Sequence, residues 1–148
     1  MTAPDENGGM CAHAMRRAIA DAGMSPNDVS WVNAHGTSTQ SNDKAETGAI
    51  KAALGDHAYD VPVSAPKSVV GHSIGAAGGV EAVASVMALR DRMAPPTVGL
   101  EEPDEGLDLN YVPGRAVPIE AQNGDGRLVA VSNSFAFGGH NATLVIST

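Results

Sequence analysis

The stretch SAPKSVVGHSIGAAGGVEAV, residues 64–83, decides the fold of this chain and holds its first candidate site. It continues an apolar, β-branched run, VPVSA at 61–65, and passes through a glycine-rich turn into an apolar helix that we expect to reach about Asp91. The turn has the G-x-S-x-G spacing of a hydrolase nucleophile elbow, with Ser73 at its centre. It also places His72 at the start of the helix. Either side chain is therefore a candidate for the reacting group.

A second strand-to-helix unit precedes this stretch. The run VSWVNAH at 29–35 is predicted to be a buried strand that ends at His35, and the hydroxyl-rich loop GTSTQSND follows it. The segment SNDKAETGAIKAAL at 41–54 predicts a helix with Ser41 or Asn42 as its N-cap. Strands that alternate with helices indicate a parallel sheet covered on both faces.

The two ends of the chain complete the predicted architecture. Residues 10–22 have the apolar spacing of an amphipathic helix, with Cys11 on its apolar face. In the last third, RLVAVSNSF at 127–135 and NATLVIST at 141–148 are rich in Val, Leu and Ile and are joined by AFGGH, which predicts two paired strands. The sequence contains no internal repeat and no low-complexity linker, so we expect one α/β domain over residues 1–148.

The composition excludes several classes of function. The chain of 148 residues is 43% hydrophobic and carries a net charge of −8, with no basic run longer than two residues, so a nucleic-acid surface is not expected. Neither a membrane-spanning apolar run nor a signal peptide is present in the sequence, and we expect a cytoplasmic protein without membrane contact. The single cysteine rules out an internal disulfide and a thiolate-rich metal site, and no metal site is predicted.

A carboxylate in the predicted apolar helix needs a partner. Glu81 is the only charged residue between Ser73 and Leu89, and an unpaired charge buried there would be costly. Lys67, just before the helix, is the obvious cation. Such a pair is compatible with a purely structural role as well as with a role in an active site.

Two histidines stand at strand-to-helix junctions. His35 ends one predicted strand and His72 follows the next, each beside glycine and a hydroxyl residue. Ligands of open α/β sheets bind at the carboxyl ends of the strands. A helix N-terminus disfavours the imidazolium form, so we expect His72 to stay neutral. Two neutral N–H donors that converge on one thioester oxygen would stabilise an enolate.

The hydrolase interpretation uses Ser73 instead. A nucleophile elbow needs a strand that delivers the serine, and here Pro66 lies close to the turn, so that strand would be short. Asp104 or Asp108 and then His140 follow in the order of a triad. This order is weak support, because a chain with five histidines and many aspartates offers some such trio.

Four motifs resemble one known family, the β-ketoacyl-acyl-carrier-protein synthases of the chain-elongating type, in their C-terminal half. The motifs are VNAHGTSTQSNDKAE, SAPKSVVGHSIGAAGGVEAV, APPTVGLEEPDEGLDLNYVP and SNSFAFGGHNATL. The resemblance covers nearly the whole chain. It implies a thiolase-like fold, with a mixed parallel and antiparallel sheet and helices on both faces, and decarboxylative Claisen condensation of malonyl carrier protein with an enzyme-bound acyl group in fatty-acid or polyketide synthesis.

The resemblance also implies roles for individual residues. His35 and His72 match the two histidines that hold the malonyl thioester oxygen, Lys67 matches the active-site lysine, and Glu81 matches its acidic partner. The implied reacting group is thus His72 rather than Ser73.

Three further residues match substrate-contacting positions of this family. Thr37 and Thr39 match threonines that contact the phosphopantetheine arm, and Phe137 matches the gating phenylalanine whose N–H contributes to an oxyanion hole. The phosphopantetheine belongs to the acyl carrier protein, the implied partner, so no cofactor of this chain itself is expected.

The chain departs from the family in one large respect. Nothing in it resembles the acyl-accepting cysteine motif of the other half, and Cys11 is better explained as a buried core thiol. The resemblance implies that the first strand of the sheet and the N-terminal half are missing, which would expose a central sheet edge. We therefore expect the chain to be stable only beside that half, in a homo- or heterodimer. Smaller departures are Ala136, where Gly is usual, and His140, where many members have Thr.

A rival from another class is a non-catalytic partner that resembles a chain-length factor. The absence of the cysteine favours this rival. The presence of His35, His72 and Lys67 argues against it, because an inert partner has no need of all three.

Overall fold

The computed structural model describes residues 8–148, in which four helices and six strands are connected by turns and loops. In chain order, the elements are α1 (Gly9–Asp21), β1 (Trp31–Asn33), α2 (Gln40–Leu54), β2 (Val63–Ser64), α3 (Lys67–Val70), α4 (Ala77–Asp91), β3 (Met93–Ala94), β4 (Val117–Pro118), β5 (Val129–Ala136) and β6 (His140–Ser147). The predicted helices and the C-terminal pair of strands are confirmed. The strands expected at 29–35 and 61–65 are shorter than predicted.

One mixed sheet organises the described residues, with strand order β2-β1-β5-β6. Strand β1 pairs in parallel with both β2 and β5, whereas β6 runs antiparallel to β5. This confirms the predicted mixed sheet. Because β1 and β5 pair directly, the unpaired edges of the sheet are the outer strands β2 and β6. The expected open central edge does not occur within residues 8–148.

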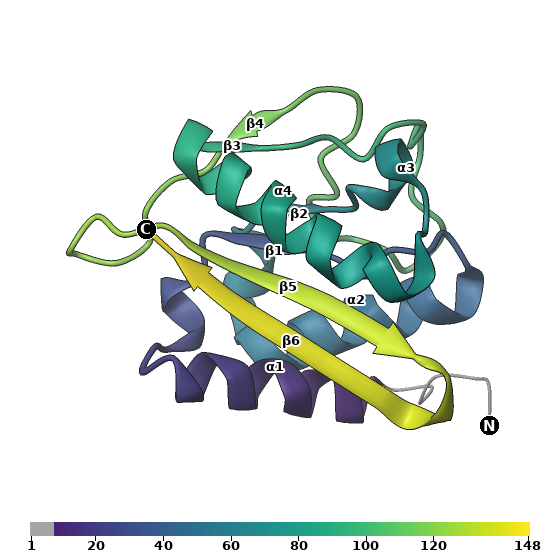
Figure 1. Cartoon of the computed structure of the whole chain (residues 1–148), viewed down its shortest axis with the longest axis horizontal. Coiled ribbons are helices and arrows are strands. Elements are labelled where there is room, and N and C mark those ends of the chain that lie inside the picture. Colours follow the sequence, from purple (N-terminus) through teal and green to yellow (C-terminus); the bar gives the residue numbers. More distant parts are fainter. Residues whose placement is uncertain (1–7) are drawn as a thin grey trace.

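Helices cover the sheet from both sides. Helices α1 and α2 pack together on one face, and α4 crosses the other face over β5 and β6 (Figure 1). Successive side chains of β5 point to opposite faces of the sheet and so contribute to both apolar cores. Val131 and Phe135 belong to the core under α1 and α2, while Ala130 belongs to the core under α4. Cys11 lies in the first core, as the sequence predicted.

The outward face of α4 is apolar and exposed. Its buried stripe is made of Ala77, Glu81, Ser85, Ala88 and Leu89, and the exposed face carries Val80, Val83, Val86 and Met87. The sequence predicted a helix buried all round. Within the described residues the sheet covers only one side of it, because a single sheet contacts only one face of a helix.

Three local features differ from the prediction or lay outside it. Helix α2 starts at Gln40 with Thr39 as N-cap, so Ser41 and Asn42 lie inside its first turn. Strands β3 and β4 form a small separate sheet that the sequence did not indicate. No helix within residues 8–148 combines the length and the apolar character needed to cross a bilayer.

Candidate functional site

The two histidines come together at the carboxyl end of β1. His35 follows β1 by two residues and is 8% exposed, and His72 lies in the turn after α3. Their rings meet edge to face, with centroids 5.6 Å apart and an interplanar angle of 88°. Phe135, near the end of β5, also lies next to His35, with ring centroids 5.8 Å apart. The fold thus unites two residues that are 37 positions apart in the sequence.

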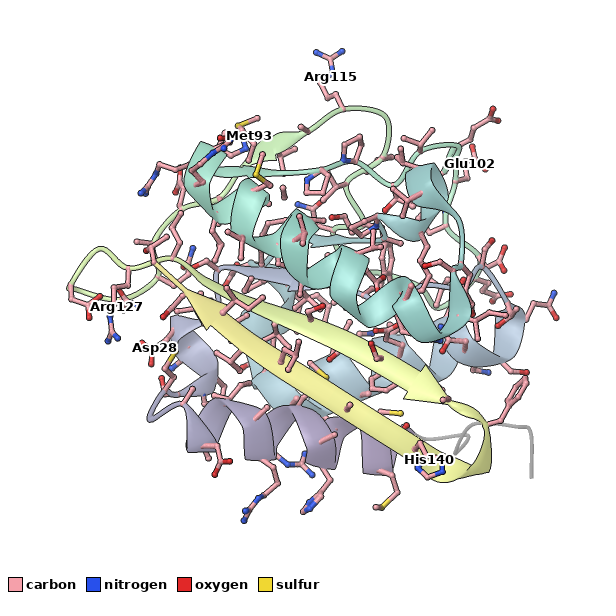
Figure 2. All side chains as sticks on the ribbon, viewed as in Figure 1. Asp28, Met93, Glu102, Arg115, Arg127 and His140 are labelled. Atoms are coloured by element: carbon pink, nitrogen blue, oxygen red, sulfur yellow. The ribbon has the colours of Figure 1, made fainter. Side chains whose placement is uncertain are left out.

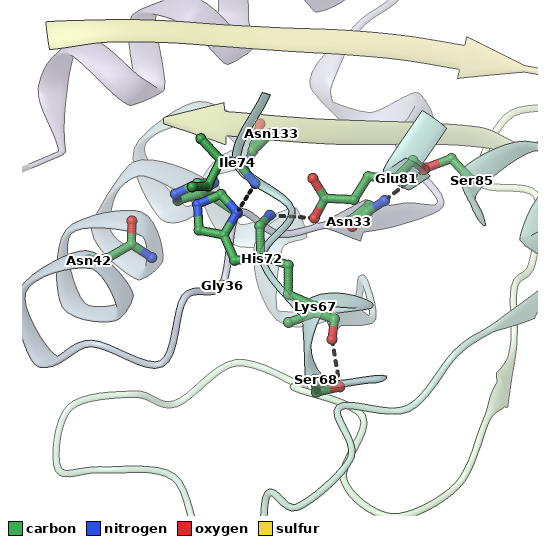
Figure 3. Close-up of polar contacts among 12 residues, drawn as sticks. Asn33, Gly36, Asn42, Lys67, Ser68, His72, Ile74, Glu81, Ser85 and Asn133 are labelled. Atoms are coloured by element: carbon green, nitrogen blue, oxygen red, sulfur yellow. Dashed lines mark hydrogen bonds and ion pairs between the residues drawn. The ribbon is translucent and has the colours of Figure 1, made fainter. Parts of the chain in front are cut away.

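A buried ion pair lies beside the histidines. The ammonium of Lys67, at the start of α3, donates to Oε1 of Glu81 on α4, as Figure 3 shows. Lys67 is 7% exposed and Glu81 only 1%, so the pair is closed off from bulk water. Burial raises the pKa of Glu81, and the hydrogen bond and charge of Lys67 oppose that rise. The predicted Lys67–Glu81 pair is confirmed.

The neutral form of His35 is strongly favoured. Burial, then the positive charge of Lys67, then His72, lowers the pKa of His35 from 6.5 to about 4. At pH 7 the ring is therefore a neutral donor and acceptor rather than a cation. Its Nδ1 is buried and has no hydrogen-bond partner within residues 8–148.

His72 has a defined tautomer when it is neutral. Its Nδ1 accepts the backbone N–H of Ile74 at 3.3 Å, which leaves the proton on Nε2 as a donor (Figure 3). Ile74 adopts a φ of 51°, a strained conformation for a β-branched residue, so this turn holds its shape against local preference. Helix α4 begins only at Ala77, so His72 lies outside its first turn, contrary to the prediction.

Glu46 of α2 anchors the loop that carries His35. Its Oε1 accepts the backbone N–H of His35 at 2.8 Å, and its Oε2 accepts that of Gly36 at 2.9 Å. Burial raises the pKa of this fully enclosed carboxyl, and the N–H donors oppose the rise. Glu46 is not among the site residues that the sequence predicts. A signal was present, because Glu46 lies three and four positions before Ala49 and Ile50 on the apolar helix face.

Gly36 is required by close packing. Its φ is 43°, and an added Cβ would lie 2.5 Å from Cβ of Ala65, at the end of β2. A side chain here would push the loops after β1 and β2 apart. The glycine therefore lets the loop of His35 lie against the segment that leads to Lys67.

The other predicted residues lie at the margins of this site. The hydroxyl oxygens of Thr37 and Thr39 are 3.2 Å apart on the loop after His35. Phe137 follows β5 and is 75% exposed, and within the described residues no ring or hydrogen-bond contact joins it to either histidine. Ala136 and His140 are exposed around the hairpin turn, where Figure 2 labels His140.

A cavity of about 490 Å³ opens beside the site. His72, Lys67, Glu46 and Thr37 contribute to its lining, together with the loop at 97–104. Its lining is mostly apolar, with a few polar side chains such as Thr37, Lys67 and His72, which is typical of a ligand pocket.

The nucleophile elbow is not formed. Ser73 lies on a turn between α3 and a 3₁₀ turn, nine residues after β2 ends, so no strand delivers it. Asp108 pairs with Lys51, and within residues 8–148 no hydrogen bond links Ser73 to Asp104, Asp108 or His140. The same residues contain no group of three His, Cys, Asp or Glu side chains that could hold a metal ion.

Comparisons with known proteins agree on one family. Residues 1–101 match the family model described as the C-terminal domain of beta-ketoacyl synthase. The 3-oxoacyl-[acyl-carrier-protein] synthase 2 of Synechocystis sp. is 51% identical over 97% of this chain and 33% of its own length.

Solved structures show the same relationship. A type II polyketide ketosynthase in complex with its acyl-carrier protein superposes with a TM-score of 0.88 at 33% identity, over 98% of this chain and 34% of that one. The ishigamide ketosynthase/chain length factor gives 0.87 at 39% identity, over 99% and 34%. The chain thus spans about a third of the length of these relatives.

Proposed function

This chain belongs to the β-ketoacyl synthase family, and we propose that it is the histidine-bearing part of an enzyme that condenses malonyl-acyl-carrier protein with an enzyme-bound acyl group. The observation that carries the proposal is the pair of facing imidazoles, His35 and His72, beside the buried Lys67–Glu81 ion pair. A structural ion pair would account for Lys67 and Glu81, but not for two imidazoles in contact beside it.

The geometry supports decarboxylation of a malonyl thioester as the first step. N–H groups of His35 and His72 bind the thioester oxygen, the bond between the α-carbon and the carboxylate breaks, and carbon dioxide leaves. The electron pair passes into the enolate, whose oxygen the two donors stabilise. Because burial and the charge of Lys67 lower the pKa of His35, the ring donates an N–H without becoming an acid that would quench the carbanion.

Carbon–carbon bond formation then needs the rest of the protein. The α-carbon attacks the acyl carbonyl carbon of a thioester on a cysteine outside this chain, and the cysteine thiolate leaves. The Thr37 and Thr39 hydroxyls hydrogen-bond the phosphopantetheine arm of the carrier protein. Phe137 gates the entrance; its high exposure and the positive φ of Gly138 and Gly139 behind it suit a residue that swings.

The exposed apolar face of α4 is the surface that the remaining two thirds of the protein cover. Val80, Val83, Val86 and Met87 form an apolar face on a helix whose other side is already packed. Relatives of this chain are about three times as long. The additional residues of such a protein, in the same polypeptide or in a companion subunit, would form the half that covers this face. We expect the complete protein to be a homo- or heterodimer.

Val83→Asp in the complete protein is expected to lower the free energy of unfolding by about 3 kcal/mol, because it buries an unpaired carboxylate. Thermal unfolding measures the effect. The matched control is Ala20→Asp on the exposed side of α1, which should change stability by less than about 0.5 kcal/mol. If the two variants unfold at the same temperature, the α4 face is exposed to water in the complete protein, and the proposal that another part covers it is wrong.

The test of the function is malonyl decarboxylation by the complete protein, followed as carbon dioxide release from malonyl-acyl-carrier protein. We expect release, and condensation once an acyl group is loaded. Decarboxylation without any condensation would favour the chain-length-factor-like partner. Labelling of Ser73 by a fluorophosphonate, with no decarboxylation, would support a serine hydrolase and end the present proposal.

A further inference from the structure

We propose that Asn133, in the middle of β5, is a positioning residue that holds His35 in place through Glu46. Asn133 is 0% exposed and lies on the central strand next to β1. The inference rests on the proposed function, because it assigns a task to Asn133 in placing one of the two thioester-binding donors.

The amide of Asn133 and the backbone of His35 share one carboxylate oxygen. Nδ2 of Asn133 donates to Oε1 of Glu46 at 3.1 Å, and the N–H of His35 donates to the same atom at 2.8 Å. The Glu46 carboxyl is buried, and within residues 8–148 the hydrogen bonds that it accepts come from N–H donors rather than from a cation. Each donor that is lost therefore destabilises the ionised carboxylate and weakens its hold on the loop.

Asn133 is itself held by the outer strand. Thr143 faces it across the β5–β6 pair, and the Thr143 hydroxyl donates to Oδ1 of Asn133 at 3.0 Å. The amide nitrogen is thereby turned toward Glu46, with Sδ of Met15 from α1 at 3.7 Å as a second neighbour. A relay of Thr143, Asn133 and Glu46 thus connects the edge of the sheet to the backbone of His35.

This relay explains why a polar residue occupies the core there. An amide at 0% exposure needs all its hydrogen bonds satisfied, and an apolar residue would fill the space without that demand. Asn133 contacts not only Thr143 on the neighbouring strand but also Glu46, which binds the His35 loop. A misplacement of about 1 Å at a reacting group can reduce the rate about 100-fold.

Asn133→Leu in the complete protein tests the inference. We expect kcat for malonyl decarboxylation to fall about 10- to 100-fold while KM and acyl loading of the cysteine change little. Ser134→Ala is the matched control, since Ser134 points to the α4 side, where its Oγ lies near Gly78. Thr143→Val should give a smaller loss of kcat than Asn133→Leu, and Thr143→Ser should retain the parent rate.

Asn133→Asp adds a pH readout that a simple packing role would not give. The titratable groups along the relay are Glu46 from α2 and His35 after β1; α1 contributes Met15 and β6 contributes Thr143, which stay neutral. At low pH a protonated Asp donates to Glu46 as the amide did, whereas at high pH two carboxylates face each other. The variant should therefore lose kcat as pH rises and this carboxyl pair loses its shared proton, where the parent does not.

Histidine NMR separates failure of this inference from failure of the proposed function. In Asn133→Leu the pKa of His35 should rise from about 4 toward its ordinary value as the loop loosens, whether or not the protein decarboxylates. A folded variant with an unchanged His35 titration overturns the relay. An equal loss of acyl loading and of decarboxylation would also overturn the relay, because it would indicate a general defect of the folded protein rather than a misplaced His35. If the parent protein releases no carbon dioxide while the titration shifts, the proposed function is wrong and the relay stands.

Discussion

Lys67→Met is expected to lower the free energy of unfolding by about 3–5 kcal/mol, the largest stability effect of any single change in the site. Within residues 8–148, the substitution removes the only cation that is hydrogen-bonded to Glu81, a carboxylate that is 1% exposed in the second turn of α4. Chemical denaturation of the parent and the variant at pH 8 measures the difference.

The pH dependence of this loss has a definite sign. Burial already raises the pKa of Glu81 in the folded protein, and removal of Lys67 raises it further. An acid whose pKa is raised by folding binds its proton more tightly in the native state, so stability falls as pH rises through the folded pKa. The destabilisation by Lys67→Met should therefore be largest at pH 8 and smaller near pH 5.

Two matched variants test the explanation. Lys67→Met combined with Glu81→Leu removes both charges and should recover most of the stability. Lys51→Met removes a cation from the surface pair with Asp108 and should cost less than about 1 kcal/mol. A double variant no more stable than Lys67→Met would show that packing of the lysine stem, rather than the stranded carboxylate, causes the loss.

The sequence could predict the parts of this site that depend on local pattern. Glu81 interrupts an otherwise apolar helix, and this alone called for Lys67 as its partner. The β5–β6 hairpin follows from two β-branched runs separated by glycines. Both His35 and His72 were found as residues that follow strands, and the parallel order of β1 and β2 then explains why they meet.

The remaining features depend on contacts that no local pattern shows. The apolar helix face marks Glu46 as buried, but no residue pattern shows that it binds the backbone N–H groups ten and eleven residues before it. Asn133 resembles any polar residue within a strand until β6 places Thr143 opposite it. Periodicity likewise shows that α4 is apolar on all sides but does not tell which side the same chain covers.

His35→Ala is expected to reduce kcat for malonyl decarboxylation by the complete protein about 100- to 1,000-fold, the range for removing one donor to a developing oxyanion. His35 is one of two imidazoles that the fold brings to the same strand end, and His72 cannot replace it from across the edge-to-face contact. Acyl loading of the cysteine in the other part of the protein should stay close to that of the parent. Single-turnover carbon dioxide release and a loading assay measure the two steps.

The pH profile gives this prediction its sharpest form. Because the pKa of His35 is lowered to about 4, the neutral donor persists through mildly acid solution, and kcat should stay level down to about pH 5 before it falls. The lowered pKa of His35 also makes folding stability depend on pH. Between pH 6.5 and 4 the unfolded chain binds a proton on this histidine more readily than the folded protein does, so the free energy of unfolding declines as pH falls. His35→Ala should abolish that part of the decline, whereas His13→Gln, on the exposed side of α1, should change neither rate nor profile. A parent enzyme that loses activity near pH 6.5 as one proton binds to His35 would contradict both the lowered pKa and the role of the neutral ring as donor.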